Sequence, residues 1–201
     1  MAGAAPNAAT ELRAGGFGVA VSAVPGSGLL DPGFFWLTEL RRQLAANQPG
    51  IVVLEFVGNY FPPYRPGVPP ASPAYLAAWS QRMQALMSEV ISRQMLAYLV
   101  IVPRMRGSSE DASSQALDRI YADMARGKAS SGVGCIDGRT SLADAAGRYA
   151  DALLGPHGLE VVRAFDGVHL SPAGDRRFGH AIAAQVVHDE GRRPSVCALD
   201  H

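Results

Sequence analysis

The segment Ile51-Val-Val-Leu-Glu-Phe-Val57 is a nearly continuous apolar run with the length of one β-strand. A run without regular alternation of polar and apolar residues is typical of a parallel strand that is buried on both faces. Leu96-Ala-Tyr-Leu-Val-Ile-Val102 repeats this pattern, and Pro103 ends it. Because parallel strands require long crossover connections, the two runs predict a sheet whose strands alternate with helices.

The rest of the chain fits this alternation. Short β-type runs are followed by segments with apolar residues at helical spacing, and the proline-rich stretch between residues 60 and 73 is predicted to be a loop. We predict strands over residues 17–24, 51–57, 96–102, 133–136 and 159–163, and helices over residues 4–13, 30–46, 73–93, 109–126, 141–154 and 172–188. This order predicts an α/β fold in which helices cover both faces of a parallel sheet.

The composition limits the classes of function. A chain of 201 residues suits one domain, and 48% hydrophobic with 18% charged residues excludes a disordered or polybasic protein. The formal net charge is zero, so no basic face for nucleic acid is indicated. The apolar runs are too short for a membrane helix, which needs roughly twenty residues, and we expect no integral membrane protein.

The two cysteines, Cys135 and Cys197, are not spaced like a metal site. In an exported protein they would often form a disulfide, and in a cytosolic one they would remain thiols. The first residues have neither the charged nor the apolar region of a signal peptide. The sequence therefore leaves the disulfide, the cellular location and the oligomeric state open.

The segment Asp166-Gly-Val-His169 carries the clearest chemical signal, because it lies between the last predicted strand and the last predicted helix. In open α/β sheets, sites form beyond the carboxyl ends of the strands. An Asp carboxylate three residues before a His can accept the imidazole Nδ1–H. This contact fixes the tautomer and leaves Nε2 as a general base. The alternative is an ordinary surface loop.

Residues 165–174, Phe-Asp-Gly-Val-His-Leu-Ser-Pro-Ala-Gly, resemble the terminal block of the SGNH (GDSL-type) hydrolases, which carries the Asp and His of a Ser-His-Asp triad. Asn59, which follows a strand and Gly58, matches the Asn whose amide contributes to that family's oxyanion hole. Gly26 resembles the glycine that supplies a second donor, and Gly28 is the next choice. Taken singly, Asn59 and the glycines also suit ordinary turns.

The resemblance implies a three-layer α/β/α sandwich, flavodoxin-like, with residues 1–201 as one domain. It implies a serine ester hydrolase that cleaves an O-acyl group from a small-molecule or carbohydrate ester. His169 would be the general base, Asp166 would orient it, and Gly26 with Asn59 would stabilise the oxyanion. Neither a cofactor nor a metal is implied.

The sequence departs from the family in its first block. The Gly-Asp-Ser block that carries the nucleophile, and the first strand before it, are missing, and residues 1–16 contain no Ser. Tyr60 also replaces the Asp that usually follows the oxyanion Asn. One explanation is that the true protein begins upstream, so that this chain is a truncated form. Another is a catalytically inactive binding protein.

A third explanation is a replacement nucleophile. Ser27 in Gly26-Ser27-Gly28 is the candidate, although Pro25 stands where a nucleophile elbow needs Gly. An acyltransferase that acts on sugars is a further alternative within the same fold, because transfer and hydrolysis share the same residues. His157 is expected in a turn, and the later histidines of the last helix at its surface or in packing.

Overall fold

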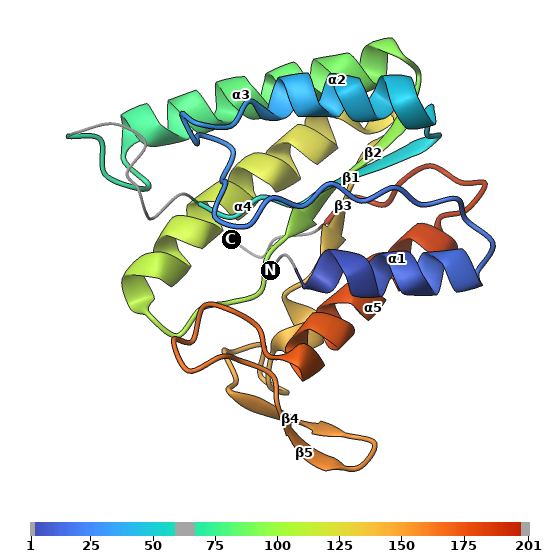
Figure 1. The fold of residues 1–201 in the computed structure, drawn as a ribbon. Helices are drawn as coiled ribbons and strands as arrows, with labels where there is room; N and C mark the ends of the chain where they lie inside the picture. The colour runs from blue at the N-terminus through green and yellow to red at the C-terminus, as the bar shows by residue number, and fades with distance from the viewer. Residues whose placement is uncertain (1–2, 59–66, 198–201) are drawn as a thin grey trace.

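The computed structural model describes residues 3–58 and 67–197, and it has three layers (Figure 1). A parallel sheet in the order β1-β2-β3 lies between two sets of helices. Its strands are β1 (Ile51–Leu54), β2 (Leu96–Ile101) and β3 (Val133–Asp137). The predicted α/β/α sandwich with a parallel sheet is therefore confirmed.

Strand β2 is the middle strand, and its side chains alternate between two hydrophobic cores. Leu99 and Ile101 enter one core, whereas Tyr98 and Val100 enter the other, and all four are fully buried. In a strand, successive side chains point to opposite faces of the sheet. Burial on both faces thus explains why this segment has no polar alternation.

Three helices cover the first face of the sheet. They are α2 (Trp36–Asn47), α3 (Pro73–Ser92) and α4 (Ser108–Lys128). Buried hydrogen bonds connect this layer: the indole N–H of Trp79 donates to the Tyr121 hydroxyl at 3.0 Å, and that hydroxyl donates to the Phe56 carbonyl at 3.1 Å. Helices α3 and α4 are thereby joined to the chain that follows β1.

The second face is covered by α1 (Ala4–Ala14) and α5 (Pro172–His188). The helix α5 begins as its sequence predicts, because Ser171 accepts a hydrogen bond from the Gly174 N–H at 3.1 Å and Pro172 occupies the first turn. Within the described residues, no helix combines the length and the apolar character that crossing a membrane requires.

The two helices of this second layer approach closely at Gly179. A Cβ placed there would lie 2.7 Å from the Asn7 Cβ and 2.8 Å from the Ala4 carbonyl oxygen, and the latter belongs to rigid backbone. Any side chain at this position must push α1 away from α5. The glycine is therefore required by packing between the helices.

We expect Gly179→Ala to destabilise the fold by about 1–3 kcal/mol, the usual cost of overpacking. The matched control is Gly127→Ala in α4, where a Cβ meets no atom within 4 Å. That change should stabilise the protein by about 0.5 kcal/mol, because alanine favours a helix over glycine. Denaturant unfolding measures both, and equal stability of the two variants would contradict the packing argument.

The predicted strand over residues 17–24 is wrong, since this segment joins no sheet in the described structure. Among the described residues, the outer edge of β1 also lacks a strand partner. Phe17 and Val19 nevertheless pack against the same core as Ile51 and Val53 of β1. The segment has the composition of a strand, but it lacks the hydrogen-bonded neighbour that a strand requires.

The predicted helix over residues 141–154 is also wrong. The chain forms a short 3-10 turn, η2 (Thr140–Leu142), and then a second turn held by Asp144. The Asp144 carboxylate accepts from the N–H groups of Ala146 at 2.8 Å and Arg148 at 2.9 Å, and Gly147 is left-handed with a φ of 74°. Asp side chains compete with helical hydrogen bonds in this way, and here the Asp144 turn forms in place of a helix.

The last two strands form a separate hairpin rather than part of the parallel sheet. Strand β4 (Ala152–Gly155) pairs antiparallel with β5 (Gly158–Val161). The strand predicted over residues 159–163 is therefore correct in its conformation for residues 159–161 but wrong in its partner. The turn between the strands contains His157, as its glycine-flanked sequence predicts.

Two helix boundaries differ from the prediction. Helix α2 begins at Trp36 rather than near residue 30, because Asp31 accepts a hydrogen bond from the Gly33 N–H at 2.7 Å and forms a turn first. Helix α4 runs through Gly127, and the chain reverses only at Gly132, which is left-handed with a φ of 81°.

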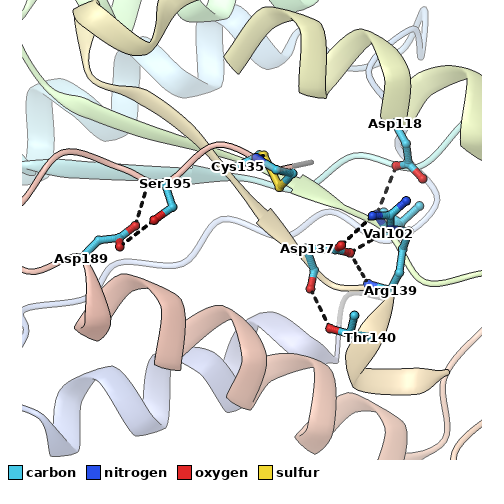
Figure 2. The surroundings of a disulfide bond; sticks show 9 residues. Val102, Asp118, Cys135, Asp137, Arg139, Thr140, Asp189 and Ser195 are labelled. Atoms are coloured by element: carbon cyan, nitrogen blue, oxygen red, sulfur yellow. Dashed lines mark hydrogen bonds and ion pairs between the residues drawn. A yellow bond between two sulfur atoms is a disulfide. The ribbon is translucent and has the colours of Figure 1, made fainter. Parts of the chain in front are cut away.

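A disulfide joins Cys135 of β3 to Cys197, which settles the question that the sequence left open (Figure 2). The tail before Cys197 lies along β3, because the Cys135 N–H donates to the Ser195 carbonyl at 2.9 Å. Asp189 at the end of α5 holds the same tail through the N–H and hydroxyl of Ser195, at 2.9 and 3.1 Å. The tail thus covers the outer edge of the sheet.

Candidate active site

The loop that contains Asp166 and His169 is a tight turn beyond β5. Arg163 and Leu170 form an isolated antiparallel bridge, and the Ala164 N–H donates to the His169 carbonyl at 2.9 Å. Gly167, with a φ of 72°, lies at the tip of this turn. A Cβ there would also collide with the Arg106 side chain. The glycine is needed both for the backbone angle and for close packing.

Within this loop, the Asp166 carboxylate holds the His169 ring. Asp166 Oδ2 lies 2.6 Å from His169 Nδ1, while Oδ1 accepts from the backbone N–H groups of Val168 and His169, both at 2.9 Å. The hydrogen bond from His169 and those from the backbone lower the pKa of Asp166 to about 2. An ionised carboxylate at Nδ1 favours the tautomer whose Nε2 carries a lone pair.

The imidazole is accessible, since 68% of the His169 side chain is exposed. The contact that orients the ring is the one between Nδ1 and the Asp166 carboxylate. This arrangement can accept a proton at Nε2 from a group that approaches from outside the loop and can return it later.

Arg106, which the sequence did not single out, supports the loop from a distant part of the chain. Its backbone N–H donates to the Gly167 carbonyl at 3.1 Å, and its guanidinium donates to the Phe165 carbonyl at 2.9 Å. The same guanidinium pairs with Asp151, just before β4. No local pattern predicts these contacts, because the partners are tens of residues apart.

Arg163 is a second support that the sequence did not reveal. Only 3% of this arginine is exposed, and its guanidinium donates to the Arg104 carbonyl at 2.5 Å. It also lies 5.2 Å from the centre of the Tyr149 ring, within the range of a cation–π interaction. Arg163 thereby fixes the base of the Asp166–His169 loop to the chain that follows β2.

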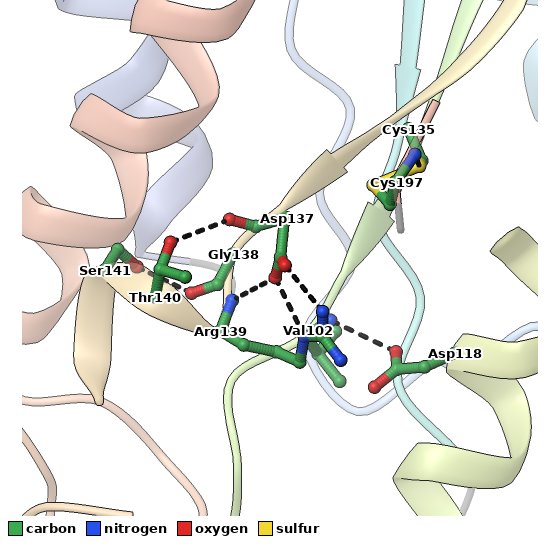
Figure 3. A network of polar contacts seen from close by, with 9 residues as sticks. All are labelled: Val102, Asp118, Cys135, Asp137, Gly138, Arg139, Thr140, Ser141 and Cys197. Atoms are coloured by element: carbon green, nitrogen blue, oxygen red, sulfur yellow. Dashed lines mark hydrogen bonds and ion pairs between the residues drawn. A yellow bond between two sulfur atoms is a disulfide. The ribbon is translucent and has the colours of Figure 1, made fainter. Parts of the chain in front are cut away.

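A polar network lies at the carboxyl ends of β2 and β3 (Figure 3). The Val102 N–H donates to Asp118 Oδ1 at 3.2 Å. The Arg139 guanidinium donates to the Asp137 carboxylate through Nε and a terminal nitrogen, at 2.9 and 2.6 Å. Asp118 is buried in α4, and this burial raises its pKa to about 7. The network ties α4 and the strand ends together.

The raised pKa of Asp118 makes stability depend on pH. The neutral carboxyl is favoured in the folded state, so its contribution is complete below about pH 4, where the unfolded group is also protonated. It is lost as pH rises from about 4 to about 7. Asp118→Asn keeps an acceptor for the Val102 N–H but cannot ionise.

We therefore expect Asp118→Asn to gain about 2–4 kcal/mol of stability relative to the parent protein between pH 4 and pH 8. Thermal and denaturant unfolding at both pH values measure this change. Asp123→Asn, at an exposed carboxylate on the same helix, is the matched control with no burial cost to relieve. If the difference in unfolding free energy between Asp118→Asn and the parent protein were the same at pH 4 and pH 8, ionisation of a buried Asp118 would be excluded.

Of the other predicted site residues, Gly26 and Ser27 lie within the described structure and Asn59 does not. Gly26 lies in a tight turn with a φ of 78°, and the Ser27 N–H and hydroxyl both donate to the Val24 carbonyl, at 3.2 and 2.7 Å. Among the described residues, no hydrogen bond joins Ser27 to His169. Asn59 and the aromatic loop after it lie outside the described residues.

A second pair of carboxylates lies near the start of α1. Burial raises the pKa of Glu55, which directly follows β1, to about 7, and the charge of Asp175 acts in the same direction. Asp175 belongs to the first turn of α5, and a Cβ placed on Gly3 would lie 2.0 Å from its Oδ2 atom. The beginnings of α1 and α5 are therefore adjacent, and α5 begins three residues after His169.

Comparison with protein families finds a model that matches residues 1–185, that of DUF459, described as a protein of unknown function. The chain belongs to the DUF459 family. A search of curated protein sequences finds no match.

Solved structures share the architecture. A candidate acylhydrolase from Bacteroides fragilis superimposes with a TM-score of 0.61 and 13% identity, over 92% of this chain and 81% of that one. A carbohydrate esterase of family 3 from Talaromyces cellulolyticus gives a TM-score of 0.60 and 13% identity, over 92% of this chain and 89% of the other. At this identity the likeness concerns the fold.

Proposed function

We propose that this DUF459 protein is a serine-type ester hydrolase of the SGNH class that cleaves an O-acyl ester of a small molecule or carbohydrate. Residues 1–201 would form one domain of this class. The Asp166–His169 pair carries the proposal, because it joins a fixed carboxylate to an accessible imidazole at 2.6 Å. The fold that the chain shares with a candidate acylhydrolase and a carbohydrate esterase supports it.

The nucleophilic serine would come from a segment outside residues 1–201, as would the strand that precedes it. Two features support this. The outer edge of β1 has no partner among the described residues, although residues 17–24 have strand-like composition and pack on the same core. The start of α1 also lies against Asp175 in the first turn of α5, so a residue ahead of α1 would enter the region of the Asp166–His169 loop.

In this mechanism, the serine oxygen attacks the ester carbonyl while His169 Nε2 takes its proton. Asp166 stabilises the imidazolium that forms. Nε2 then returns the proton to the departing alcohol oxygen, which leaves an acyl-enzyme. Water, deprotonated at the same nitrogen, releases the carboxylic acid and restores the serine.

Negative charge develops on the carbonyl oxygen in both steps. The backbone N–H of Gly26 and the side-chain amide of Asn59 would donate to it, and removal of one such donor typically costs on the order of a hundredfold or more in turnover. Gly26 suits this role because its turn follows the strand-like segment 17–24. Ser27 is a poor alternative nucleophile, since its hydroxyl donates to the carbonyl of its own turn.

We expect a longer polypeptide, extended by the residues encoded in frame before Met1, to hydrolyse a short p-nitrophenyl ester. His169→Ala in that polypeptide should lower kcat by about a hundredfold to ten-thousandfold. His180→Ala is the matched control, because the exposed His180 ring also meets a carboxylate through Nδ1, that of Glu11 at 2.7 Å.

For the proposal to stand, His169→Ala must lose far more activity than His180→Ala. Equal loss in both, or full activity in His169→Ala, would reject the Asp166–His169 pair as catalytic machinery. Product analysis with a sugar acceptor distinguishes hydrolysis from acyl transfer. Tight binding of an acylated sugar without turnover in the extended polypeptide would instead favour a binding protein.

A further inference from the structure

The β4–β5 hairpin has two chemically different faces. In antiparallel pairing, opposite residues share a face, so Leu154 and Leu159 lie together, as do Ala152 and Val161. The inner face carries Leu153, which packs against the α1–α5 core, and Glu160, which pairs with Arg177 of α5 at 3.3 Å. The inner face thus fixes the hairpin to the domain.

The outer face is aliphatic and open to solvent. Leu154 is 80% exposed, Leu159 75% and Val161 62%. Figure 1 shows the hairpin projecting from the body of the molecule below α5. Single exposed apolar residues are ordinary, but a contiguous apolar patch marks an interaction surface.

The outer face is followed along the chain by the candidate active site. The chain runs from β5 directly into the Asp166–His169 loop, and Phe165 at the start of that loop is 98% exposed. Arg106 connects the two parts, because its guanidinium bonds both the Phe165 carbonyl and Asp151 just before β4. Arg106 therefore connects the start of the hairpin to the start of the Asp166–His169 loop.

We propose that the outer face of the hairpin, together with Phe165, docks this protein onto the hydrocarbon surface of an uncharged lipid aggregate. The docking face consists of Ala152, Leu154, Leu159, Val161 and Phe165. Their side chains offer no hydrogen-bond donor or acceptor, so nothing on this face would orient a sugar or a polar peptide.

The size of the face argues against a second copy of the chain. Four aliphatic side chains and one phenyl ring cover roughly 400–600 Å², whereas a stable protein interface takes about 800 Å² from each partner. Insertion into lipid has no such minimum, because each apolar side chain contributes separately by leaving water.

The charge near the face selects the kind of lipid. Residues 144–177 contain four arginines, at positions 148, 163, 176 and 177, and Arg106 also contacts this segment; against these five cations stand five carboxylates, at positions 144, 151, 160, 166 and 175. This balance gives no attraction to anionic headgroups, which basic clusters provide. A zwitterionic surface is therefore the expected partner.

The test is co-sedimentation of the full chain with phosphatidylcholine vesicles, which needs no turnover and so does not depend on the proposed hydrolysis. We expect the parent protein to partition onto the vesicles and Leu154→Gln/Leu159→Gln to partition about a hundredfold less, about tenfold for each leucine. Val187→Gln, at a half-exposed valine of α5, is the matched control and should partition like the parent.

A second measurement keeps the apolar face intact. The fluorescence of Leu159→Trp should shift to shorter wavelength when vesicles are added, because the indole enters an apolar medium. Failure of the parent protein to partition, equal partitioning of the double glutamine variant, or an unshifted indole would overturn the proposal. Self-association that the double variant abolishes, without vesicle binding, would assign the face to a second copy and overturn it likewise.

Discussion

Burial of β2 on both faces is the constraint on which the rest of this structure depends. A strand whose alternate side chains all lie in hydrophobic cores must be covered by helices on both sides. The helices α2, α3 and α4 cover one face, and α1 and α5 cover the other. Because parallel strands all end at the same edge, this arrangement also brings the polar strand ends together, where Asp118, Asp137 and Glu55 lie.

The sequence predicted the parts of the fold that local pattern determines. The two apolar runs became β1 and β2, and residues 172–188 became α5 with the expected cap. The helix predicted over residues 141–154 is wrong because its helical apolar spacing competes with a turn that Asp144 and Gly147 form. The strand predicted over residues 17–24 is wrong for a different reason. Strand-like residues form a strand only beside a hydrogen-bonded partner strand, and periodicity does not reveal whether such a partner is present.

In the candidate site, too, local sequence reveals some residues and long-range contacts bring in others. Asp166 and His169 could be found because the carboxylate reaches a ring only three residues away, so the contact is nearly a property of the segment. Arg106 and Arg163 could not be found, since they act on carbonyl groups 59 residues distant. Sequence reasoning thus identifies the candidate acid–base groups but not the side chains that hold their loop in place.

A short distance between imidazole and carboxylate does not by itself define a catalytic pair. His180 and Glu11 meet at 2.7 Å, close to the 2.6 Å of His169 and Asp166. The difference lies in the carboxylate: Asp166 accepts two further backbone N–H bonds in a turn that Gly167 and Arg106 fix, whereas Glu11 lies on an exposed helix surface. A carboxylate fixed in this way holds the ring in one orientation, which a proton relay requires and a surface ion pair does not. In the proposed mechanism, the serine would lie ahead of α1, whose start contacts the first turn of α5 soon after the Asp166–His169 loop.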